Sequence, residues 1–182
     1  MVYIDFNLQE KSVFLQNEFD STTMTGTSLE NSRLLYHGST IPVPNPGILV
    51  RGFYKDFGYG FYCTHFEKQA QRWALSKKDG HVVSVYQFSL DSTMKILTFN
   101  NMTEEWLDFV VACRRGISHE YDIVEGPMAD DQIWDYVEDF INGKITREAF
   151  WVLVKFKNPT HQIAFCSERS LQTIQYERSY PL

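Results

Sequence analysis

The sequence contains no apolar run near the roughly 20 residues that a membrane-spanning helix requires. Its first residues, MVYIDFNLQEKSV, also lack the basic segment and the following apolar segment of a secretory signal. Both absences argue against membrane insertion and export. We therefore expect a cytoplasmic protein with no membrane partner.

Cysteine is scarce: Cys63, Cys113 and Cys166 are widely spaced and form no CxxC pair. An odd and dispersed set argues against a disulfide framework and against a cysteine metal site. Nothing in the sequence activates Cys63 as a nucleophile. We expect buried free thiols in a reducing compartment.

Positive charge is also limited, because 17 Lys and Arg stand against 23 Asp and Glu, which gives a net charge of -6. This balance argues against broad electrostatic binding to nucleic acid, although it leaves room for a local basic groove. Asp122, Asp130 and Asp131 form an acidic group that looks metal-binding. Acidic residues near a helix start are adequately explained by capping, so we expect no metal.

Aromatic residues, in contrast, are abundant at 15% of the chain, although many of them will simply fill a core. A length of 182 residues fits one domain. Residues 1–32 read differently, with short apolar patches followed by a Ser/Thr-rich loop. We expect 1–32 to be an appended segment and 33–182 to be the main domain.

Hydrophobic periodicity and turn signals predict short strands mixed with helices. The expected strands are 34–37, 61–63, 82–90, 121–124, 162–166 and 171–176. The expected helices are 64–76, 103–115, 129–141 and 146–155, and the first of them opens with a T-x-x-E capping box at Thr64 and Glu67. Without regular alternation of strand and helix, the fold class is α+β and not a doubly wound sheet.

The most informative stretch runs from Leu35 to Trp73 and holds YHGS, GILVRG and FGYGFYCT, followed by a helix. This ordered set resembles the nicotinamide-binding half of the ADP-ribosyltransferases, nearest the histidine–tyrosine branch shared by diphtheria-type toxins and the poly(ADP-ribose) polymerases. The later segments YDIVEGPMADD and HQIAFCSERSL resemble a bacterial family with the same core. The resemblance spans about 33–174 and implies a split β-sandwich of two small sheets with flanking helices, with NAD as the substrate.

The resemblance assigns a role to each matched residue. His37 would contact ribose hydroxyls and orient the dinucleotide, and it would not act as the base. Gly38 would let its bare backbone approach the nicotinamide carboxamide, and Ser39 completes this cofactor-binding element. Arg51 is a candidate for the pyrophosphate because guanidinium pairs well with phosphate oxygens; a surface arginine is an equally good interpretation.

Aromatic side chains would hold the nicotinamide, whose ring is cationic in oxidised NAD. A cation over an aromatic face gains about 0.5–2 kcal/mol. The resemblance makes Tyr62 one wall of the slot and a catalytic residue. Trp73 lies where relatives often place the second ring, and core packing is the competing interpretation.

Gln162 is where the sequence departs from the family pattern. Relatives often begin this strand with a glutamate that grips the nicotinamide-ribose hydroxyl, and Gln162 is its counterpart by position. Glutamine donates and accepts hydrogen bonds but adds no negative charge, so it stabilises an oxocarbenium ion less. Ala70 stands near the place of a serine in relatives, and Glu168 is the nearest downstream carboxylate if Gln162 is not catalytic.

Together these matches predict an NAD-dependent mono-ADP-ribosyltransferase, in the manner of a bacterial toxin or defence effector. The expected partners are NAD, a macromolecular acceptor (protein or nucleic acid) and an antitoxin protein. One alternative is a module that binds NAD or ADP-ribose without turnover. A second is an NAD-dependent RNA 2′-phosphotransferase, for which Arg51, Arg72, Arg114 and Arg115 are the candidate phosphate ligands.

Overall fold

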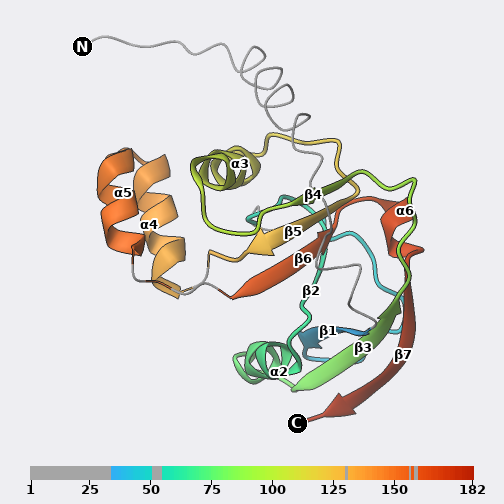
Figure 1. The fold of residues 1–182 in the computed structure, drawn as a ribbon. Helices are drawn as coiled ribbons and strands as arrows, with labels where there is room; N and C mark the ends of the chain where they lie inside the picture. Colours follow the sequence, from blue (N-terminus) through green and yellow to red (C-terminus); the bar gives the residue numbers. More distant parts are fainter. Residues whose placement is uncertain (1–33, 51–54, 130, 156, 158–159) are drawn as a thin grey trace.

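The computed structural model describes residues 34–50, 55–129, 131–155, 157 and 160–182. Its fold class is α+β, as the sequence predicts: two small sheets form a split sandwich with flanking helices (Figure 1). The predicted appended segment 1–32 and the candidate Arg51 lie outside the described residues.

The smaller sheet has three strands in the order β1-β3-β7. Strand β1 (Leu34–Ser39) and strand β7 (Ile174–Pro181) each pair antiparallel with the central β3 (Val82–Phe88). Helix α2 (Glu67–Leu75) lies against β1 and β3 (Figure 1). This layer carries the first motif of the sequence, His37-Gly38-Ser39.

The larger sheet has four strands in the order β2-β6-β5-β4. Strands β2 (Phe61–Cys63), β6 (His161–Phe165) and β5 (Ile123–Pro127) pair antiparallel in that order. Strand β4 (Ile96–Thr98) joins β5 in parallel at the edge. The tyrosine motif and the late glutamine strand are therefore direct neighbours, although they are far apart in sequence.

Helices cover the larger sheet on the side away from the smaller one (Figure 1). They are α3 (Glu104–Arg114), α4 (Asp131–Ile141) and α5 (Arg147–Val154). A short helix α6 (Glu168–Leu171) links β6 to β7. No helix among the described residues has the length and apolar character needed to cross a membrane.

Strand β6 shows how the two faces of the larger sheet differ. Ile163 and Phe165 point toward the smaller sheet and join a core with Leu35 and Tyr86. Ala164 points the other way, into the core formed with the helices. This alternation follows from the two-residue period of a strand, and it decides on which face each candidate side chain lies.

Two expected helix caps have different outcomes. The Thr103 hydroxyl accepts a hydrogen bond from the Trp106 N–H at 3.3 Å and caps α3, as predicted. The capping box predicted at Thr64 is wrong, because α2 begins at Glu67 after Phe66, with no side-chain cap. The Thr64 hydroxyl instead donates to the Gln69 side chain and accepts from the Phe66 N–H.

Gly38 allows α2 to approach β1 closely. A Cβ at Gly38 would lie 2.1 Å from the Ala70 carbonyl oxygen and 2.8 Å from the Ala74 nitrogen. Both atoms belong to the helix backbone and have little freedom to move. The structure therefore gives Gly38 and the buried Ala70 a packing role that is independent of any ligand.

We predict that Gly38→Ala destabilises the protein by about 1–3 kcal/mol or more, because the added methyl group overpacks a rigid contact. Urea denaturation measures this loss. Gly47→Ala is the matched control, since a Cβ there meets nothing within 4 Å. Its stability should stay within about 0.5 kcal/mol of the parent chain. Equal stability of the two variants would contradict the close approach of α2 to β1.

Candidate functional site

The two sheets are joined where β1 passes β2. Tyr36 and Thr64 exchange backbone hydrogen bonds, with N···O distances of 2.9 and 3.0 Å. Next to this bridge, His37 Nδ1 lies 2.7 Å from the Tyr62 carbonyl oxygen. A carbonyl oxygen only accepts, so Nδ1 carries the proton and donates it. The histidine and tyrosine motifs therefore meet at one junction.

The surroundings of His37 favour its neutral form. Burial lowers the pKa of the imidazole, nearby Lys77 lowers it further, and the bond to Tyr62 acts in the opposite direction. The ring packs against Phe61, with 4.5 Å between ring centroids. With Nδ1 fixed as a donor, Nε2 is left as a hydrogen-bond acceptor. The binding and orienting role of His37 stays a prediction.

Ser39 ends β1 at the beginning of the proline-rich loop. Its hydroxyl donates to the Ile41 carbonyl oxygen at 2.8 Å, in an exposed setting. This contact turns the chain out of the strand. The structure thus shows a local turn role for Ser39, and the cofactor-binding role stays a prediction.

Tyr62 lies on the opposite face of β2 from the His37 imidazole. Phe61 and Cys63 belong to the core between the sheets, whereas Tyr62 packs against the core under the helices. Its hydroxyl donates to the Gly58 carbonyl oxygen at 2.7 Å and accepts from the Phe57 N–H at 3.2 Å. Burial raises the pKa of the phenol. In this structure Tyr62 fixes the turn 56–60.

Trp73 lies on the outer part of α2 and is 41% exposed. The Lys77 ammonium stands 5.1 Å from the centroid of its ring. Within the described residues, the rings of Trp73 and Tyr62 make no contact. Trp73 is therefore not a core residue, and the structure does not itself assemble the two-walled slot that the sequence predicts.

Gln162 belongs to a buried polar network on the helix-covered side of the larger sheet. Its amide Nε2 donates to Asp56 Oδ2 at 3.0 Å, and the Ala129 N–H donates to the same oxygen at 2.8 Å. The Arg114 guanidinium binds Asp56 Oδ1 at 2.6 Å, and its side chain is 2% exposed. Gln162 is thus held away from the face that carries His37.

The other candidates from the sequence are explained by structural contacts, by burial or by surface exposure. Arg114 is committed to Asp56, and the exposed Arg115 bonds the Ile141 carbonyl oxygen. Asp122 accepts from Arg169 and Ser167, so a salt bridge explains it. Burial raises the pKa of the Cys63 thiol, which agrees with an inert cysteine. Arg72 and Glu168 are exposed at the surface.

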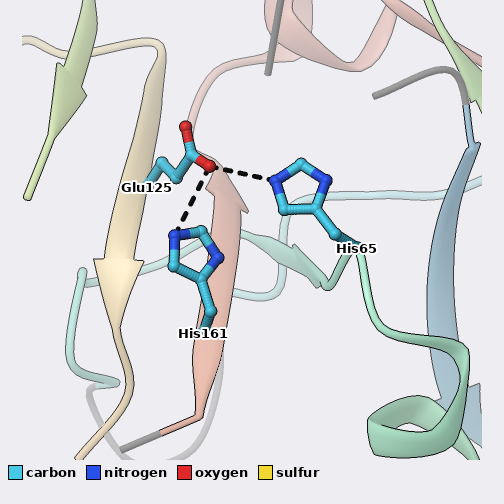
Figure 2. A group of neighbouring side chains, drawn as sticks. All are labelled: His65, Glu125 and His161. Atoms are coloured by element: carbon cyan, nitrogen blue, oxygen red, sulfur yellow. Dashed lines mark hydrogen bonds and ion pairs between the residues drawn. The ribbon is translucent and has the colours of Figure 1, made fainter. Parts of the chain in front are cut away.

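Two histidines that no sequence motif singled out meet a buried glutamate in one cluster (Figure 2). His65 follows β2, Glu125 lies within β5, and His161 begins β6. Both imidazole Nε2 atoms approach Glu125 Oε1, at 3.0 Å from His65 and 3.4 Å from His161. Because Glu125 shares a strand face with Ile123, it points toward the smaller sheet.

The cluster is largely buried but remains partly accessible to solvent. The Glu125 side chain has no exposure, whereas those of His65 and His161 are 14% and 25% exposed. Burial lowers the pKa of His161, Glu125 raises it, and His65 lowers it again. The Gln69 amide donates to the His161 carbonyl oxygen at 2.8 Å and ties the start of β6 to α2. Glu125, the charged residue within the otherwise apolar stretch IVEGP, is the one sequence signal of this site.

Comparison with known proteins identifies the family of this chain. A family model described as a protein of unknown function, DUF3990, matches residues 34–176. The chain belongs to the DUF3990 family. No curated protein matches it significantly in sequence. The DUF3990 region covers β1 to β6 in full and the first residues of β7, and it includes His37, Gln162 and the histidine–glutamate cluster.

We predict that Gln162→Glu destabilises this DUF3990 protein by about 2 kcal/mol or more near neutral pH, since it places a second buried carboxylate against Asp56. Repulsion raises the pKa of the new carboxyl group above its unfolded value. The loss should therefore be small near pH 5 and grow toward about pH 8. Urea denaturation across this range measures it.

Gln87→Glu is the matched control, because Gln87 lies exposed on β3. Its stability should stay within about 0.5 kcal/mol of the parent chain at every pH. If Gln162→Glu follows the control at pH 8, the amide of Gln162 does not face Asp56 in solution.

Proposed function

We propose that this DUF3990 protein is an NAD-dependent mono-ADP-ribosyltransferase. The observation that carries the proposal is the junction of the two sheets, where the His37 imidazole is bonded to the Tyr62 backbone. The split sandwich brings the backbone of the tyrosine motif next to His37, and this proximity supports the proposal. His37 is the residue we place in contact with NAD.

The geometry of His37 suits a ribose hydroxyl. The bond from Nδ1 to the Tyr62 carbonyl fixes the ring orientation and the tautomer. Packing against Phe61 restricts the ring further. The remaining nitrogen, Nε2, accepts the proton of a hydroxyl group, and a neutral ring has no charge to repel the nicotinamide cation. Such a group orients the dinucleotide and takes no proton from the acceptor.

In the proposed reaction, the bond between the nicotinamide nitrogen and the ribose C1′ carbon breaks. Nicotinamide leaves with the electron pair as a neutral molecule. An acceptor group on a protein or nucleic acid attacks C1′ and loses its proton to solvent. By resemblance, Trp73 would border the nicotinamide, and Gly38, Ser39 and Arg51 would lie along the dinucleotide. The phenol of Tyr62 faces the core under the helices, so its predicted place at the nicotinamide does not fit this geometry. The setting implied by the resemblance is a cytoplasmic bacterial toxin or defence effector neutralised by an antitoxin.

A second candidate is a module that binds NAD or ADP-ribose without turnover. The observation that favours it is Gln162, which is neutral and hydrogen-bonded to Asp56. A side chain held in this way cannot also grip the nicotinamide ribose. The RNA 2′-phosphotransferase is less well supported, because Arg114 is buried against Asp56 and is lost as a phosphate ligand.

We predict that the parent chain binds NAD and releases nicotinamide in the presence of cell lysate. His37→Ala should weaken NAD binding by about tenfold, the value of one lost hydrogen bond of about 1–1.5 kcal/mol. Calorimetry gives the affinity, and chromatography with labelled NAD gives nicotinamide and the labelled acceptor.

His81→Ala is the matched control, because the Nδ1 atom of His81 also bonds a backbone carbonyl, that of Ala74. It should keep the parent affinity and turnover. Binding without nicotinamide release or a labelled product would favour the silent module over the enzyme. A parent chain that neither binds NAD nor releases nicotinamide would rule out both.

A further inference from the structure

The histidine–glutamate cluster has the composition of a metal centre. Its three donor atoms come from the segment after β2, from the middle of β5 and from the start of β6. One ligand atom from each of His65, Glu125 and His161 lies within 4.8 Å of the others. Strand pairing and the β1–β2 junction, and not a local sequence motif, bring these atoms together.

The position of Glu125 calls for a positive partner. It lies in β5 with no exposed side-chain surface, and a carboxylate removed from water is costly unless it is paired. Figure 2 shows both imidazoles directed at this carboxylate from different elements. Two imidazole nitrogens and one carboxylate oxygen form a donor set that suits Zn²⁺ and related divalent metals.

We infer that His65, Glu125 and His161 bind a divalent transition-metal ion, with Zn²⁺ as the best-fitting probe. Three protein ligands leave a fourth tetrahedral position for water or another ligand, as in zinc sites that are not purely structural. The partial exposure of both histidines gives the ion a path from solvent. The hydrogen bond from Gln69 to the His161 carbonyl oxygen holds one ligand strand in place.

The test uses the full chain, freed of metal with a chelator and titrated with ZnCl₂ in a calorimeter. One ion should bind per chain with a Kd of about 1 µM or tighter. Excess MgCl₂ should not displace it, because Mg²⁺ prefers an octahedral shell of oxygen atoms. Since the titration contains no NAD, its outcome is independent of the proposed transferase activity.

His161→Ala and Glu125→Gln should each weaken Zn²⁺ binding by at least about 100-fold. His81→Ala is the control and should bind as the parent does. X-ray absorption spectroscopy of the zinc-loaded parent chain identifies the ligands directly, even if a variant fails to fold. It should show nitrogen and oxygen ligands, imidazole included, at about 2.0–2.2 Å and no sulfur.

Three results would overturn the inference. The first is a parent chain that takes up no Zn²⁺ in a saturable manner, which would leave the cluster as a hydrogen-bonded triad. The second is a sulfur ligand at about 2.3 Å, which would assign the ion to a cysteine. Displacement by Mg²⁺ would equally contradict ligation by imidazole.

Discussion

The arrangement of this protein depends on the short contact between β1 and β2. Two backbone hydrogen bonds between Tyr36 and Thr64 join the two sheets, whose described strands otherwise pair only within their own sheet. The His37 imidazole lies beside these bonds. This contact sets the position of His37 relative to the tyrosine motif. It also fixes the exit of β2, from which His65 reaches β5 and β6. Both proposed sites therefore depend on one junction.

A buried network around Asp56 holds the other side of the larger sheet. Asp56 accepts hydrogen bonds from Arg114, Gln162 and the Ala129 N–H. Removing either Asp56 or Arg114 would leave an uncompensated buried charge and cost more than breaking a surface ion pair. The network accounts for a neutral amide at Gln162, because a carboxylate at this position would repel the carboxylate of Asp56. It anchors the turn that precedes β2.

Local signals made much of the fold predictable. The bounds of β2 match the prediction, and the cap at Thr103 is confirmed, because each depends on residues adjacent in sequence. The capping box predicted at Thr64 was wrong, because the Thr64 hydroxyl hydrogen-bonds the side chain of Gln69 instead. Strand β4 and helix α6 were not predicted, because three or four residues show little periodicity of their own. Strand β2 is equally short, but it directly follows the glycine-rich turn 56–60.

The candidate sites were harder to predict than the elements. His37 could be named as a candidate because its motif is local in the sequence, and its role stays a prediction. The face on which Gln162 lies depends on strand register, which the sequence does not reveal, and its partner Asp56 is 106 residues away. His65 and Glu125 are 60 residues apart and come together because β2 and β5 both pair with β6. Non-local pairing thus created the sites that sequence reasoning missed.

Amide chemical-shift mapping with unlabelled NAD is the most direct measurement of where the dinucleotide binds. If the junction is the NAD site, the largest shifts will fall on residues 36–39 and 61–64, where β1 and β2 meet. Shifts confined to α3, α4 and α5, or an unchanged spectrum at saturating NAD, would contradict this account.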